Sequence, residues 1–157
     1  MKLFQKSRRR LVIRWSIIVC LMINSAPLIA RGGGPLRRQI EVSAAGIRIE
    51  AIIVRKKIAM SDLQISNARI VDIDQEPSLR PWIKIYGVGL PTNRQGWFVL
   101  KNRQKALLML KRFHRVVYIP TDRGYALLLS PAQPEEFLNA LQNPPVNGRI
   151  FSIESTP

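Results

Sequence analysis

"VVYIPTDRGYALLLSPAQPEEFLNALQNPP" spans Val116–Pro145 and changes character halfway along. Its first half holds two apolar runs separated by Asp-Arg-Gly, residue types that form tight turns between strands. The lengths of the runs predict strands at Val116–Pro120 and Tyr125–Leu129, with the turn at residues 122–124. This segment therefore begins as a β-hairpin.

The second half of the same stretch predicts a helix. Pro134 suits the first helical position, and the two glutamates after it complement the positive end of the helix dipole. Apolar residues between Phe137 and Leu141 fall on one helical face, and the Asn-Pro-Pro at 143–145 ends the helix. A single amphipathic helix thus follows the hairpin.

The residues before the hairpin also predict strands, because apolar and polar side chains alternate or form short runs between turn residues. Within Gln39–Val54 the alternation continues on both sides of a corner at residues 44–46. Further strands are expected at Ile65–Ile73, Trp97–Lys101 and Lys105–Leu110, with a hairpin tip at Asn102-Arg103 and either a last strand at Arg149–Ile153 or a free tail. The fold class is therefore mainly β, a small barrel or sandwich of about seven strands closed by one C-terminal helix.

The glycines of "YGVGLPTNRQGWFVL" (Tyr86–Leu100) raise the question of a phosphate-binding loop. A dinucleotide fingerprint needs Gly-x-Gly-x-x-Gly between a strand and a helix, whereas a strand is expected after this stretch. No helix N-terminus is then available to hold a phosphate. We interpret Gly87, Gly89 and Pro91 as a corner of the β-structure, and Trp82, Trp97 and Phe98 as packing residues.

Several segments, in this order, resemble the bacterial pleckstrin-homology-like domain family. The resemblance is carried by Gly87-x-Gly89-Leu90-Pro91, Gly96-Trp97-Phe98-x-Leu100, Lys105-Ala106, Val116–Thr121 and Tyr125 leading into Leu129-Ser130-Pro131. It implies a PH-like barrel of about seven strands closed by the helix, over residues 39–145, with residues 146–157 as a C-terminal tail. Members of that family often follow a transmembrane segment, so the resemblance also implies a membrane-associated protein. Where the family usually has an aspartate before the helix-opening proline this chain has Gln133, a weaker N-cap.

The N-terminal segment has the layout of an export signal or a signal anchor. Nine Lys or Arg and no acid lie between Met1 and Arg38, around an uncharged run at Trp15–Ala30. With Arg14 at the membrane surface, residues 11–30 supply the roughly 20 needed to cross a bilayer. We predict a transmembrane or signal helix within residues 1–30, an uncleaved anchor being favoured over a cleaved signal, and a Gly-rich linker at residues 31–38.

This arrangement predicts the location of the protein. More bases precede the apolar run than follow it, so the N-terminus stays in the cytoplasm and the domain lies outside the bacterial cytoplasmic membrane. If the signal is cleaved, the domain is secreted or periplasmic. Ser7–Ile13 also resembles a twin-arginine export signal, which leaves the export route open.

The basic excess outside the N-terminus is modest. The net charge is +15, but the remaining 119 residues carry 16 bases against 10 acids, and no alternation of bases and aromatics forms a stacking platform for nucleic acid. We expect no nucleic-acid partner. Two basic clusters are candidate contacts for anionic lipid headgroups: Arg55, Lys56 and Lys57 at a hairpin corner, and Lys111, Arg112 and Arg115 in a loop.

Few residue patterns suggest catalysis, a cofactor or a metal. His114 is the only histidine and Cys20 the only cysteine, so neither a two-histidine site nor a cysteine-based zinc site can form within this sequence. Asp72 and Asp74 are spaced to share one side of a strand, an arrangement that can bind a cation but more often marks a solvated strand end. We expect no enzyme, no cofactor and no catalytic residue.

The sequence therefore predicts a membrane-tethered, non-enzymatic interaction or self-assembly module of PH-like fold. Its partner is then another protein or a second copy, bound through loops or an exposed strand edge. The alternative is peripheral binding of anionic lipid headgroups by the two basic clusters.

Overall fold

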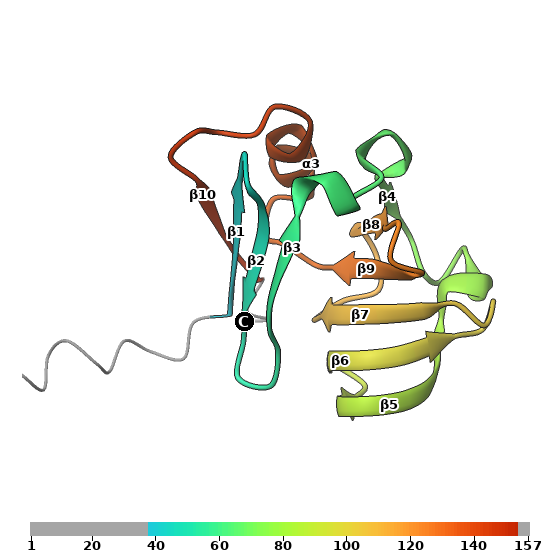
Figure 1. Ribbon diagram of the computed structural model, residues 1–157. Helices are drawn as coiled ribbons and strands as arrows, with labels where there is room; N and C mark the ends of the chain where they lie inside the picture. The colour runs from blue at the N-terminus through green and yellow to red at the C-terminus, as the bar shows by residue number, and fades with distance from the viewer. Residues whose placement is uncertain (1–37, 154–157) are drawn as a thin grey trace, which may run out of the picture. The chain divides into compact units, whose positions relative to one another are not determined.

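The computed structural model describes residues 38–153 as two β-sheets and one α-helix (Figure 1). The predicted N-terminal transmembrane or signal helix lies outside the described residues. Within them, no helix is both long enough and apolar enough to cross a bilayer.

The smaller sheet is antiparallel and contains the first three strands and the last one. Its order is β10-β1-β2-β3, with β1 at Gln39–Ser43, β2 at Gly46–Glu50, β3 at Arg55–Ala59 and β10 at Arg149–Ser152. The expected alternation appears in its burial, because Ile40, Val42, Ile47 and Ile49 are buried while Arg48 and Glu50 between them are exposed. One face of this sheet therefore points into the core.

The larger sheet has six strands in the order β4-β8-β9-β7-β6-β5. They are β4 (Arg69–Val71), β5 (Pro81–Leu90), β6 (Asn93–Leu100), β7 (Lys105–Leu110), β8 (Val116–Pro120) and β9 (Tyr125–Leu129). All neighbours are antiparallel except β7 and β9, which are parallel because β8 lies on the far side of β9. Three short 3-10 turns connect the elements: η1 (Met60–Asp62), η2 (Ile65–Asn67) and η3 (Pro77–Leu79).

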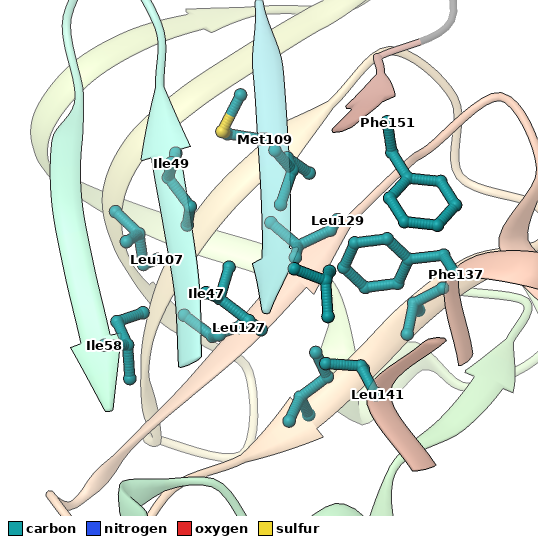
Figure 2. Packing of buried hydrophobic residues seen from close by; sticks show 14 of the residues in the cluster. Ile47, Ile49, Ile58, Leu107, Met109, Leu127, Leu129, Phe137, Leu141 and Phe151 are labelled. Carbon is teal, nitrogen blue, oxygen red and sulfur yellow. The ribbon is translucent and has the colours of Figure 1, made fainter. Parts of the chain in front are cut away.

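The main core lies between the two sheets and under the helix α3 (Pro134–Gln142). Figure 2 shows Phe137 and Leu141 of α3 among isoleucines of the smaller sheet and leucines of the larger one. The rings of Phe137 and Phe151 meet edge to face with centroids 5.0 Å apart. Because α3 contacts β1 as well as β4 and β8, it joins the two sheets at one end.

A second apolar cluster covers the opposite face of the larger sheet. Leu108 and Leu128 point into it, and the segment that follows β4 covers it with Ile73 and Leu79. Strands β7 and β9 are thus buried on both faces, which explains why their sequences read as continuous apolar runs.

The structure confirms the β-rich class and the C-terminal helix and corrects several details. The two sheets are not closed into a barrel, and residues 38–153 form ten strands where about seven were expected. The strand expected at Ile65–Ile73 is a 3-10 turn followed by the three residues of β4. The predicted helix start at Pro134 is correct, without a side-chain cap from Gln133.

The interpretation of the glycine-rich stretch as a corner is correct for Pro91, which lies in the turn at residues 91–92, and wrong for the two glycines. Gly87 and Gly89 lie within β5. Gly87 faces Gly96 across the β5–β6 ladder, with φ of 122° and 121°. A Cβ on either residue would overlap the carbonyl oxygen of the opposite strand, so this close backbone approach requires glycine on both sides.

We expect Gly96→Ala to destabilise the domain by about 2 kcal/mol or more, because the added Cβ meets backbone that cannot move aside and φ is positive. Gly124→Ala is the matched control. Gly124 also has positive φ, but nothing lies within 4 Å of an added Cβ, so the cost there is only the φ preference, about 1 kcal/mol. Urea unfolding of both variants measures the difference, and equal losses would contradict the steric argument.

Candidate interaction surface

The outermost strand of the larger sheet, β5, carries the largest group of exposed apolar side chains in the described part of the chain. Its sequence, PWIKIYGVGL, places apolar residues at neighbouring positions instead of alternating them with polar ones. Five of its large side chains are exposed: Trp82, Ile83, Ile85, Tyr86 and Leu90. Trp82 is 62% exposed and Tyr86 61%, although such side chains are usually covered in an isolated domain.

The register explains why these side chains are left uncovered. Figure 1 shows β5 at the edge of the sheet, with β6 on its inner side. Ile83 pairs with Val99 and Lys84 with Phe98, but irregularities in the ladder leave Trp82 and Ile85 without an opposite residue. Two bulges within four residues bend an edge strand and interrupt its row of backbone groups.

The charged residues on β5 and on the strands next to it have one sign. Between residues 77 and 121 the chain has nine Lys or Arg and no Asp or Glu. Those on β5, β6, β7 and their connections are Lys84, Arg94, Lys101, Arg103 and Lys105. Because these strands are neighbours in the sheet, the apolar edge lies in a basic surrounding.

One lysine of the smaller sheet reaches the larger sheet beside this edge. The Lys56 Nζ lies 5.1 Å from the ring centroid of Trp97 and 5.3 Å from that of Tyr125. The two rings meet edge to face, 5.0 Å apart. Such cation–π contacts stabilise the junction of the two sheets by about 0.5–1 kcal/mol each. Lys56 thus holds the sheets together next to Tyr86, which pairs with Trp97.

The first predicted basic cluster is not at a hairpin corner, because Arg55, Lys56 and Lys57 all lie in β3. Arg55 and Lys57 are exposed and Lys56 is half-buried. The alternating directions of successive side chains in a strand place Lys56 on the face toward the aromatic rings and its two neighbours on the other face. The three bases therefore do not form one contact surface.

The second predicted cluster follows the end of β7. Arg115 forms an ion pair with Glu135 at 2.6 Å, and the Arg112 guanidinium donates to the carbonyl of Pro131. Burial lowers the pKa of Arg112, and the Arg115 charge lowers it further while Glu135 opposes both. The backbone N–H of Lys111 donates to the hydroxyl of Ser130.

The structure does not bring the two predicted clusters together. Lys56 lies against Tyr125 at the start of β9, whereas Lys111 and Arg112 contact residues that follow the end of β9. Five residues of strand separate these positions by about 17 Å.

The carboxylates proposed as a cation or acid–base pair have structural partners. Asp72 accepts the backbone N–H of Asp74 in the turn after β4, and Asp74 forms an ion pair with Arg80 at 3.0 Å. His114 is exposed. Among residues 38–153, no three His, Cys, Asp or Glu side chains are placed to hold a metal ion.

Sequence reasoning missed β5 itself. Trp82, Trp97 and Phe98 were expected to be packing residues of the core or of a loop, yet only Phe98 is buried, Trp97 is half-buried and Trp82 is exposed on a strand. The signal that could have located the strand is "WIKIY", a run of β-branched and aromatic residues before the first glycine. Gly87 and Gly89 were instead interpreted as turn residues.

Tyr125 predicts how stability depends on pH. Burial raises the pKa of its hydroxyl above the ordinary value near 10, the Asp62 carboxylate raises it further, and Arg123 opposes the shift. When the pKa of a group is higher in the folded state than in the unfolded state, its contribution to stability is fully present below the unfolded-state pKa. That contribution is lost as the pH rises through the folded-state pKa. Between about pH 9 and pH 11 the native chain should therefore lose more stability than Tyr125→Phe, as measured by urea unfolding at each pH. Parallel losses in the two proteins would contradict this prediction.

The comparisons with known proteins agree with this architecture. No curated protein and no solved structure matches the chain. A family model described as a bacterial PH domain matches residues 38–144, which include β1 to β9 and α3 but not β10. The match confirms the resemblance carried by the segments between Gly87 and Pro131. This chain belongs to the bacterial PH domain family.

Proposed function

We propose that this chain is a membrane-tethered, non-enzymatic interaction or self-assembly module, and that β5 is its binding surface. The observation that carries the proposal is the five large apolar side chains exposed on one edge strand. An apolar patch concentrated on one element marks an interaction site more often than scattered exposed residues do. Membership of the PH family supports an interaction role, since domains of this kind are generally not catalytic.

The tether in this proposal rests on the sequence. Residues 31–38 contain three glycines and a proline after the predicted anchor, a composition typical of a flexible linker, and eight residues can span at most about 28 Å. A domain held by such a linker stays close to the bilayer outside the cytoplasm. Every weak contact between the domain and the membrane, or between two tethered copies, gains from the raised local concentration.

Peripheral binding of anionic headgroups is the second candidate function. The specific observation that favours it is the six bases without an acid at residues 77–110. The six basic residues proposed from the sequence, Arg55, Lys56, Lys57, Lys111, Arg112 and Arg115, support it less well. They lie at opposite ends of β9, and Lys56 and Arg115 already have partners within the domain.

Cysteine labelling in cells tests whether β5 is covered. In a Cys20→Ser background, Ile85→Cys places a single thiol on β5, and Val146→Cys places one at a residue that is 89% exposed. We expect a membrane-impermeant maleimide to label position 85 much more slowly than position 146 on the full-length chain in intact membranes. The two positions should react at similar rates once the membranes are dissolved in detergent.

Both thiols replace exposed side chains, so the folded domain tolerates them. Equal labelling of the two positions in intact membranes would overturn β5 as the binding surface. If position 146 does not react in intact membranes, the domain lies on the side that the reagent cannot reach. That result would overturn the predicted orientation.

A further inference from the structure

We propose that β5 lies against an anionic bilayer surface, with Trp82, Ile85 and Tyr86 in the interfacial region and Lys84 at the headgroups. This inference rests on the proposed function, because it names the partner of the same strand. It also moves the lipid contact away from the basic residues expected from the sequence. Three features of the described domain favour a bilayer over a protein strand or a second copy.

The first feature is the kind of side chain that β5 exposes. Trp and Tyr have an apolar ring with one polar group, which suits the boundary between headgroups and hydrocarbon. Ile83 and Ile85 add aliphatic surface beside them. Lys84, between the two isoleucines, is long enough to keep its ammonium group among the phosphates while its methylenes lie in the apolar layer.

The second feature is the sign of the surrounding charge. A second copy that paired through β5 would bring its own Lys84 and neighbouring bases against the same set, with no acid between residues 77 and 121 to oppose them. An anionic bilayer complements this surface instead. Each base near such a membrane contributes about 1 kcal/mol of attraction at physiological ionic strength.

The third feature is the irregular backbone of the strand. An added protein strand needs a regular row of unpaired N–H and C=O groups, and the register irregularities at Trp82 and Ile85 in the β5–β6 ladder make the backbone of β5 irregular. Pro81 at the strand start and Lys84 near the bulges are further features that natural sheets use to discourage edge pairing. Contact with a bilayer uses only the side chains and does not require a regular row of backbone hydrogen-bonding groups.

The first described strand begins at the same end of the domain as β5. Gln39, the first residue of β1, pairs with Glu50 at the end of β2, so β1 begins beside the β2–β3 turn. That turn exposes Ile52, which is 56% exposed. Figure 1 shows the β2–β3 turn and β5 at the same, lower end of the described domain, with α3 at the other end.

An environment-sensitive fluorophore on β5 tests the inference. The full-length chain with Cys20→Ser and Ile85→Cys is labelled with a nitrobenzoxadiazole dye and placed in nanodiscs that contain phosphatidylglycerol, or phosphatidylcholine alone. In the anionic discs we expect a blue shift of the dye and strong quenching by spin-labelled lipids. Raising the salt from about 0.1 M to about 1 M shortens the Debye length from roughly 10 Å to roughly 3 Å and should reduce the quenching. A dye at position 146 should show neither effect.

Matched variants separate the contributions of the strand. Trp82→Ser and Lys84→Gln should each reduce quenching of the dye at position 85 in the anionic discs. Ile150→Ser removes an equally exposed apolar side chain from β10 and should leave the quenching unchanged. Equal effects of all three variants would contradict a specific role of β5.

The outcomes distinguish this inference from the proposed function. A dye at position 85 that stays in water in anionic discs, while the same position is protected in cells, overturns the bilayer contact but leaves β5 as a binding surface for a protein. Disulfide-linked pairs formed through the thiol at position 85 would then identify a second copy as the occupant. Water exposure in the discs together with rapid labelling in cells would overturn both proposals.

Discussion

The domain depends on the burial of both faces of the parallel pair β7 and β9. One face is covered by the smaller sheet and α3, and the other by the segment after β4. The two strands contribute two rows of leucines, and Met109 adds to the row that faces the smaller sheet. Completely burying a side chain of this size contributes about 1.5–3 kcal/mol. Burial of these leucines therefore holds the covering elements against the two strands.

The same geometry leaves β5 uncovered. The larger sheet is six strands wide, but the covering elements gather over its centre, where β7 and β9 lie. On the side toward the smaller sheet, burial decreases from the centre outward: Leu107 is fully buried, Trp97 is half-buried and Tyr86 is exposed, although the three pair in one row across β7, β6 and β5. The exposed edge is therefore a consequence of how far the smaller sheet reaches.

Much of the fold could be predicted wherever the local signal and the tertiary structure agree. The strands at Val116–Pro120 and Tyr125–Leu129 and the helix from Pro134 have the predicted bounds, because turn residues, apolar runs and the Asn-Pro-Pro stop all act locally. The candidate surface could not be predicted in this way. Gly87 and Gly96 resemble turn residues in the sequence, and only their pairing across two strands shows that they allow a close backbone approach. The exposure of Trp82 likewise depends on which other elements cover β5, and the residue pattern of one strand does not contain that information.

The pairing of β1 with β10 has a consequence for synthesis of the chain. Gln39 faces Ser152, so the first described strand completes its sheet only when nearly the last described residues arrive. Bringing together positions more than 100 residues apart carries a loop-closure cost, and non-local pairing of this kind slows folding. While the ribosome is still adding the helix and the tail, β1 has β2 on one side and nothing on the other. The nascent domain therefore exposes an unpaired strand edge until residues 149–152 have been synthesised, which makes chaperone protection during folding advantageous.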